Sequence, residues 1–275
     1  MSVSVRTWLS GVFREHHDHP FALGPEADLR HAAAMLWFAA QPGASILAAE
    51  SRVLGEHLAD RFGYHLLQVG ALPGVDLLRS SRILHRCIVD LEGGAPDAGY
   101  PHVRGRAGAL PLESDSVDVM LLPHVLEFEP RPHEALREAA RVLVPEGHLF
   151  VSALNPWSLL GVWRAARRGG GNAPWTGRFL AQGRMRDWLE LVGLELLSVN
   201  AVFFRPPLRN ARVLDRLAVL EALGSRLWPV FCGAYVLGAR KRVARATPIR
   251  APIRYRPRLV GVGLAGPSTR VRDER

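Results

Sequence analysis

The stretch that decides the fold is Leu110–Pro156, LPLESDSVDVMLLPHVLEFEPRPHEALREAARVLVPEGHLFVSALNP. Its apolar pattern predicts a buried strand over Ser116–Leu122 and an amphipathic helix over about Arg131–Leu143. A Pro145-Glu146-Gly147 turn follows, and then a second strand over His148–Ala153. Two strands joined by a crossover this long are expected to lie parallel in one sheet. Ligands of such sheets bind beyond the carboxyl ends of the strands.

This stretch also resembles a known family. The segments SVDVMLLPHVLEF and HEALREAARVLVPEGHLFVS are similar to the second half of the class I S-adenosylmethionine-dependent methyltransferase core. In that family an Asp opens the fourth strand, and an REAxRVLxPGG run leads into the fifth. The similarity is greatest to an uncharacterised bacterial branch in which the fourth strand runs into Leu-Pro-His and the fifth into Asn-Pro-Trp-Ser.

The resemblance implies an α/β fold. We expect a Rossmann-like, seven-stranded, mostly parallel sheet with helices on both faces and an antiparallel last strand, which the family inserts between its fifth and sixth strands. It also implies an enzyme with S-adenosylmethionine as cofactor, transferring a methyl group by in-line displacement to a small-molecule or lipid-like acceptor. The sulfonium activates the methyl group, so the protein must bind the cofactor and align a nucleophile. The alternative is a non-catalytic relative used for binding or scaffolding.

A glycine-containing turn follows the first predicted strand, Tyr64–Val69. The family has an acidic-x-G-x-G-x-G motif here, where a side chain would occupy the ligand's volume or require an unfavourable φ. Gly70 and Gly74 match the outer glycines, whereas Gln68 replaces the acid and Leu72 the middle glycine. The resemblance therefore implies cofactor contacts from Gln68, Val69, Gly70 and Gly74.

The second predicted strand, Arg86–Leu91, ends near Asp90. In nucleoside-binding α/β sheets an acid at this place accepts hydrogen bonds from both ribose hydroxyls. Asp90 is the best candidate by spacing, and Glu92 or Asp97 could replace it. The alternative is a solvated acid at a strand end.

The third predicted strand and its outgoing loop cover His102–Leu110. Family members often have Asp-Ala-Glu-x-Leu-Pro here, with the Asp on the adenine amino group, but this chain has Arg106 instead. The resemblance implies cofactor contacts from Ala107, Gly108 and Leu110, with backbone groups of the first two facing the adenine.

The end of the fourth strand carries the predicted catalytic residue. The resemblance places Leu122 and Pro123 on the cofactor, and His124 where methyl group and acceptor meet. Imidazole can accept a proton near neutral pH. The alternative is a histidine that hydrogen-bonds the loop or packs on the cofactor. Glu127 and Glu129 are interpreted as the solvated start of the following helix.

Segments outside this core are assigned by their periodicity. Asn155 could bind substrate, although capping of the next helix is favoured. The expected helices are Leu29–Ala40, Ala48–Phe62 (with Val53, Leu54, His57, Leu58 and Phe62 on one face), Trp157–Arg168, Phe179–Val192 and Val213–Trp228. The last two strands are expected at Leu194–Phe204 and Gly233–Arg240. The first two helices are expected to cap the cofactor edge.

Charge and composition divide the chain. Residues 240–275 contain eleven Lys/Arg and two Asp/Glu, which equals the whole net charge of +9, while residues 1–239 contain 24 of each sign. We predict an N-terminal arm and helix (1–47), a methyltransferase-like domain (48–240) with a lid insertion at 156–178, and a basic disordered tail (241–275). The tail is interpreted as a solubility segment. Weak contact with RNA or anionic surfaces is the alternative, and a nucleic-acid-binding function is the least favoured.

Composition also limits the site chemistry. Cys87 and Cys232 lie far apart in apolar surroundings and predict neither a disulfide framework nor a thiolate metal site. We expect a reducing, cytoplasmic setting, with no secretory signal and no membrane span. His16, His17 and His19 lack regular ligand spacing and are interpreted as a polar turn. No metal site is predicted.

Overall fold

The computed structural model describes residues 33–90, 99–166, 177–207 and 228–242, with residues 216, 217, 221, 224, 226 and 266. The chain divides into a compact unit of residues 1–243 and a second unit of residues 244–275. The predicted N-terminal arm with its three histidines, Glu92, Asp97, most of the predicted helix Val213–Trp228 and almost all of the predicted tail lie outside the described residues. The predicted domain boundaries stay predictions.

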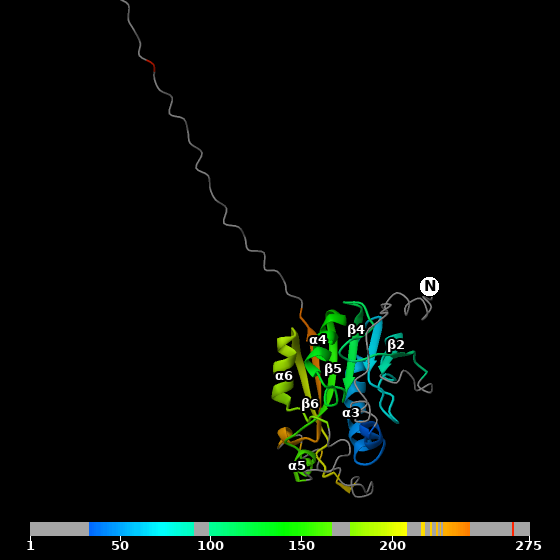
Figure 1. Cartoon of the computed structure of the whole chain (residues 1–275), viewed down its shortest axis with the longest axis vertical. Helices are drawn as coiled ribbons and strands as arrows, with labels where there is room; N and C mark the ends of the chain where they lie inside the picture. The colour runs from blue at the N-terminus through cyan, green and yellow to red at the C-terminus, as the bar shows by residue number, and fades with distance from the viewer. Residues whose placement is uncertain are drawn as a thin grey trace, which may run out of the picture. The chain divides into compact units, whose positions relative to one another are not determined.

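Seven strands form one sheet in the order β3-β2-β1-β4-β5-β7-β6 (Figure 1). Strands β1 to β5 pair in parallel, and β7 runs antiparallel between β5 and β6. The strands are β1 (His65–Val69), β2 (His85–Asp90), β3 (His102–Arg104), β4 (Val117–Pro123), β5 (Leu143–Leu154), β6 (Leu194–Val202) and β7 (Ala234–Lys241). This arrangement confirms the predicted fold class.

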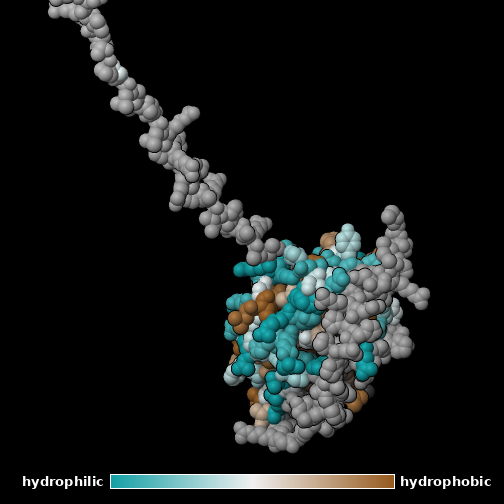
Figure 2. Space-filling view, turned by 45° about the horizontal axis from the view of Figure 1, so that its top comes forward, coloured by the Kyte–Doolittle hydropathy of each residue, from teal (hydrophilic) through white to brown (hydrophobic). Residues whose placement is uncertain are grey.

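The helices lie on both faces of the sheet because alternate strand residues point to opposite sides. The helices with described bounds are α3 (Gly43–Ala59), α4 (Pro132–Val142), α5 (Leu159–Ala166) and α6 (Gln182–Leu191), with a 3₁₀ turn η2 (Pro229–Phe231). Residues 33–39, within the predicted helix Leu29–Ala40, are also helical. On one face Leu136 of α4 and Leu189 of α6 share a buried cluster with Met120 of β4. On the other face Leu54 of α3 packs with Leu121, the next residue of β4. The surface seen in Figure 2 is mostly hydrophilic, with scattered hydrophobic residues.

Local sequence explains where α4 and α6 begin and end. Pro132 occupies the first turn of α4, where its missing N–H costs nothing. Glu134 lies in the first turn and Arg141 in the last, each with the charge that the helix dipole favours. Helix α6 is followed by Gly193 at φ 80°, a left-handed conformation that suits glycine.

The connection between β1 and β2 differs from the usual strand-to-helix turn of an α/β sheet. A glycine-containing turn of this kind normally opens a helix, but no helix lies between Val69 and His85. Leu77, Leu78 and Ile83 of this connection are nevertheless buried beside α3 and cover that face of the sheet. The connection therefore supplies core residues without a helix.

One predicted boundary within the central stretch is wrong. The Pro145-Glu146-Gly147 segment is part of β5, which runs without interruption from Leu143, and Glu146 has φ 65°. The pairing of β4 with β5 shifts register between Val117 and Val119 and so accommodates the irregularity. Within the range predicted for the third strand and its outgoing loop, β3 covers His102–Arg104, and Arg106 bridges Ala109 in a tight turn.

The flanking helices differ from expectation in extent and exposure. Helix α3 begins at Gly43 and ends at Ala59, so Phe62 lies beyond it and is 77% exposed. In α5 Leu160 is buried, whereas Leu159 and Val162 are exposed. Among the described residues, no helix is long and apolar enough to cross a membrane.

Candidate functional site

The carboxyl ends of β1, β2, β4 and β5 meet at one edge of the sheet. The strand order reverses at β1, whose neighbours are β2 on one side and β4 on the other. In open α/β sheets the crevice at such a switch point is where ligands bind. The last residues at this edge are Val69, Asp90, Pro123 and Leu154, and three of these four belong to the predicted site.

The turn after β1 has the conformation of a backbone ligand cradle. Gly70 and Gly74 have φ values of 85° and 70°, which side-chain-bearing residues rarely adopt. A Cβ on Gly70 would lie 3.1 Å from Val125 Cγ2, while one on Gly74 would meet nothing within 4 Å. Leu72 packs against the core clusters on the α3 side. The backbone at Gly74 thus borders open space, which fits a bound nucleoside cofactor.

The Gln68 side chain stabilises the turn after β1. Its side chain is 3% exposed, and its Nε2 donates a hydrogen bond to the carbonyl of Gly70 at 2.8 Å. The Gly70 amide in turn donates to Val89 O of β2 at 2.8 Å. Gln68 and Val69 are therefore buried supports of the turn, and Gly70 and Gly74 form its surface.

The loop after β3 is held by the residues that depart from the family motif. Arg106 Nη2 lies 3.2 Å from Glu129 Oε1 in a largely buried ion pair. A Cβ on Gly108 would lie 3.6 Å from Glu129 Oε1 and 3.7 Å from Glu134 Cβ. The loop predicted to contact the adenine thus packs against the residues that begin α4. The Arg106 side chain is used there in an ion pair within the protein.

Three of the predicted cofactor contacts are core residues. Ala107, Leu110 and Leu122 are 6%, 5% and 1% exposed and share the cluster on the α4 and α6 side. The Leu110 amide donates to Glu138 Oε1 at 2.9 Å, so it is already used within the protein. Only backbone groups of these residues could face a ligand. Asp90 ends β2 opposite Arg104 of β3 and is partly exposed.

His124 directly follows β4 and is enclosed by two carboxylates. Its Nδ1 lies 3.0 Å from Glu127 Oε1, and its Nε2 lies 2.9 Å from Glu50 Oε2 of α3. The Phe38 ring packs on the imidazole at 4.3 Å between centroids. The His124 backbone has φ 53°, and its amide donates to Ser152 O of β5. Both ring nitrogens are therefore engaged in a buried cluster.

The electrostatics of this cluster favour a protonated imidazole at neutral pH. Burial lowers the pKa of His124, but the carboxylates of Glu50 and Glu127 outweigh it and raise the pKa to about 10. Burial raises the pKa of Glu50, against the lowering effect of His124. Glu50 Oε1 and Glu127 Oε2 are buried without a hydrogen-bond partner among the described residues. An imidazolium held between two carboxylates cannot accept a proton while they remain in place.

Glu127 and Glu129 are not the solvated residues that the sequence suggests. They are 2% and 8% exposed. Glu127 Oε1 also accepts a hydrogen bond from the Leu154 amide at 2.6 Å, which joins the His124 loop to the end of β5. Burial raises the pKa of Glu129, against the lowering effect of Arg106. His124 and Glu127 are three residues apart, and this short separation was the feature of the sequence that could have indicated their contact.

Asn155 has a structural role in this arrangement. Its Oδ1 accepts the Trp157 amide at 3.2 Å, and its Nδ2 donates to Val230 O at 2.6 Å. It is 1% exposed, so its side chain shapes the turn before α5. The expectation that Asn155 caps a helix beginning at Trp157 is wrong, because α5 begins at Leu159 and Ser158 Oγ accepts the Gly161 amide at 3.1 Å.

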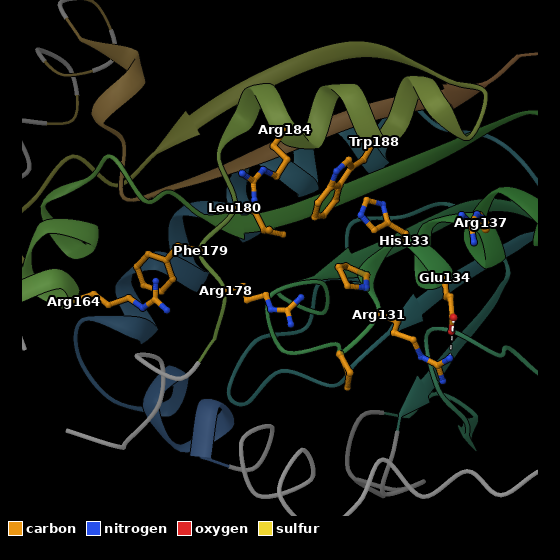
Figure 3. A pocket seen from close by; sticks show the side chains of 12 residues that line it. Arg131, His133, Glu134, Arg137, Arg164, Arg178, Phe179, Leu180, Arg184 and Trp188 are labelled. Carbon is orange, nitrogen blue, oxygen red and sulfur yellow. Dashed lines mark hydrogen bonds and ion pairs between the residues drawn. The ribbon is translucent and has the colours of Figure 1, made fainter. Parts of the chain in front are cut away.

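The sequence did not reveal a pocket of about 620 Å³ at the same edge (Figure 3). It lies between the start of α4 and the segment that leads into α6, and arginines dominate its lining. These arginines are scattered over residues 131–184, and only the fold brings them together. Among the described residues, no group of three or more His, Cys, Asp or Glu could hold a metal ion.

Part of the chain is similar to known proteins. Residues 88–151 match the family model described as a methyltransferase domain. The chain is 31% identical over 155 residues to the uncharacterized protein YafS of Escherichia coli strain K12; the match covers 56% of this chain and 62% of that protein's length.

Solved structures with the same fold are more distant in sequence. One is a SAM-dependent methyltransferase of Thermotoga maritima, described as a possible histamine N-methyltransferase. It has a TM-score of 0.51 and 18% identity, and the match covers 72% of this chain and 92% of that one. Another is the (4+2)-cyclase SpnF, with a TM-score of 0.50 and 20% identity over 70% of this chain and 80% of that one. At these identities the likeness shows the fold. The family match adds that residues 88–151 resemble a methyltransferase domain.

Proposed function

We propose that this protein is an S-adenosylmethionine-dependent methyltransferase that acts on a small-molecule or lipid-like acceptor. The observation that carries the proposal is the left-handed glycine turn, Gly70 to Gly74, at the switch point between β1 and β4. Such a turn lets backbone groups approach a ligand closely. S-adenosylmethionine, when bound, supplies an electrophilic methyl group and a neutral leaving group.

The residues that would hold the cofactor are mostly backbone elements. Gly70 and Gly74 would border it, with Gln68 fixing the turn and Asp90 meeting the ribose hydroxyls from the end of β2. The protein's contribution to the reaction is then to orient donor and acceptor in line and to exclude water. No nucleophilic side chain is needed for this step.

His124 is better suited to positioning than to proton transfer. Its two ring nitrogens bind Glu50 and Glu127, which tie α3 and β5 to the loop after β4. Acceptance of a proton from substrate would require one of these carboxylates to move away. We propose that His124 fixes the shape of the loop beneath the methyl-transfer position and that the acceptor nucleophile loses its proton elsewhere.

A non-catalytic binding role is the second candidate, and specific observations favour it. Leu72 replaces a glycine, Arg106 is paired with Glu129, and no helix follows the glycine turn. The fold also does not fix the reaction, since SpnF is named as a cyclase. A protein that binds cofactor without transferring its methyl group would satisfy the same geometry.

Isothermal titration with S-adenosylmethionine tests both candidates. We expect a dissociation constant in the micromolar range, lost in Gly70→Arg while the circular dichroism spectrum stays native. Absence of heat at about 1 mM cofactor would contradict both an enzyme and a cofactor-binding scaffold. Binding of cofactor without formation of S-adenosylhomocysteine, across a panel of acceptors, would favour the scaffold.

A further inference from the structure

We propose that the arginine-lined pocket between α4 and α6 binds a phosphate-bearing ligand and is the acceptor site. This inference rests on the proposed methyltransferase function, whose substrate class it names. The pocket has a volume of about 620 Å³, within the range of small-molecule sites. Its charged lining residues are Arg131, Glu134, Arg137, Arg164, Arg178 and Arg184.

The position of the pocket fits an acceptor. The Arg178 amide donates to Glu127 O of the loop after β4, and the Leu180 amide donates to Leu154 O at the end of β5. The pocket wall is therefore attached to the carboxyl edge of both strands. Glu134 belongs to this lining and also lies against Gly108 of the predicted adenine loop. The Glu134 side chain thus lies between the pocket and the loop that is predicted to contact the cofactor.

The net positive charge of the pocket lining favours binding of an anion. Five arginines and one glutamate give an excess of four positive charges. Arg131 is paired with Glu134 at 3.0 Å. Within the described part of the chain, no carboxylate forms an ion pair with Arg137, Arg178 or Arg184. Guanidinium groups match the geometry of phosphate oxygens with two hydrogen bonds each. A phosphate dianion matches this excess better than a single carboxylate.

The pocket also provides a surface for an apolar or flat part of the ligand. Trp188 contacts His133 at 4.1 Å between ring centroids, and Leu180 lies beside them (Figure 3). Arg164 lies over the Phe179 ring at 5.0 Å, which holds this cation at the other side of the pocket. The ligand we infer therefore combines a phosphate with an apolar or aromatic group.

Such a phosphate could belong to a soluble metabolite or to a lipid headgroup. Helix α5 carries Arg164 toward the pocket and exposes Leu159 and Val162 to solvent, as a lipid-facing helix would. The shared chemistry is the phosphate, and the probes of the experiment separate the two sources.

Calorimetric titration with phenyl phosphate tests the proposal in the absence of cofactor. We expect binding that weakens at least about tenfold between about 20 mM and 300 mM NaCl, and at least about tenfold in Arg137→Gln/Arg184→Gln. The matched control is Arg186→Gln, which removes one exposed arginine from the same helix α6 but does not line the pocket. It should bind within about twofold of wild type.

The outcomes separate the possibilities. No heat with phenyl phosphate, equal binding by the double variant, or equal binding of uncharged phenol would overturn the inference. Tighter binding of dihexanoyl phosphatidic acid than of phenyl phosphate, with dihexanoyl phosphatidylcholine inactive, would assign the lipid source; the reverse order would assign a soluble phosphate. Cofactor binding without phosphate binding refutes this inference alone, whereas phosphate binding without cofactor binding refutes only the proposed function.

Discussion

Glu50 Oε2 lies 2.9 Å from His124 Nε2, so a helix that precedes the sheet is bonded to the loop at the end of its fourth strand. Both side chains are at most 1% exposed. The pair is extended by Glu127, which binds the other ring nitrogen and the amide of Leu154. One cation thus joins α3, the β4 loop and β5 at the edge where the site lies.

Replacement of His124 should destabilise the protein strongly. His124→Gln would leave two buried carboxylates without a cation, and breaking a buried ion pair from one side costs about 3–5 kcal/mol. Urea denaturation should show this loss in the free energy of unfolding. The control His133→Gln changes an exposed histidine whose ring contacts Trp188, and it should cost no more than about 1.5 kcal/mol. A stable His124→Gln variant would show that the cluster contributes little to the fold.

The same cluster predicts a loss of stability at alkaline pH. The pKa of His124 is raised from its ordinary 6.5 to about 10 in the folded protein. The stabilisation that protonated His124 gives to the folded protein is therefore complete below pH 6.5, and it is lost as the pH rises through about 10. The free energy of unfolding should fall with a slope of at most about 1.4 kcal/mol per pH unit in that window.

Glu50→Gln is the matched test of this pH dependence. Removal of one of the two carboxylates should lower the pKa of His124, so the decline in stability should begin at a lower pH than in wild type. Glu56→Gln removes an exposed carboxylate from the same helix and should leave the curve unchanged. Superimposable curves for wild type and Glu50→Gln would contradict the assignment to His124.

The central βαβ unit could be predicted because its information is local. The continuous apolar run of β4 and the period of α4 are visible within about 50 residues. The position of β7 between β5 and β6 is a long-range pairing, and it was expected only from the family resemblance. Between Val69 and His85 the chain forms no helix, and Leu77 and Leu78 of this connection cover the sheet instead.

The candidate site was less predictable because its contacts join residues that are far apart in the sequence. Glu50 and His124 are 74 residues apart, and nothing near either residue indicates the other. Glu127 resembles the polar start of a helix, but the loop folds inward and buries it. The pocket arginines occupy four different segments, so their convergence depends on how α4, α5 and α6 pack.

The departure of Gln68 from the family's acid leads to a third prediction. Its amide donates a hydrogen bond to Gly70 O, and an ionised carboxylate at this place would face that oxygen without a proton. We expect Gln68→Glu to lose about 1–3 kcal/mol of stability at pH 7. The loss should be smaller near pH 4.5, where a protonated Glu can donate. Gln68→Leu, which lacks a donor at every pH, is the control and should show no such recovery relative to wild type. A Gln68→Glu variant as stable as wild type at pH 7 would mean that the turn does not depend on this bond.

The two glycines of the turn can be distinguished by alanine substitution. Each has a left-handed φ, so each substitution should cost about 1–2 kcal/mol from the backbone alone. Gly70→Ala should cost more than Gly74→Ala, because its Cβ would lie 3.1 Å from Val125 Cγ2 while that of Gly74 meets open space. Val125→Ala should therefore recover part of the loss in Gly70→Ala and none of that in Gly74→Ala, measured by double-mutant cycles of urea denaturation. Equal losses for the two single variants, with no coupling to Val125, would show that backbone conformation alone requires glycine at both positions.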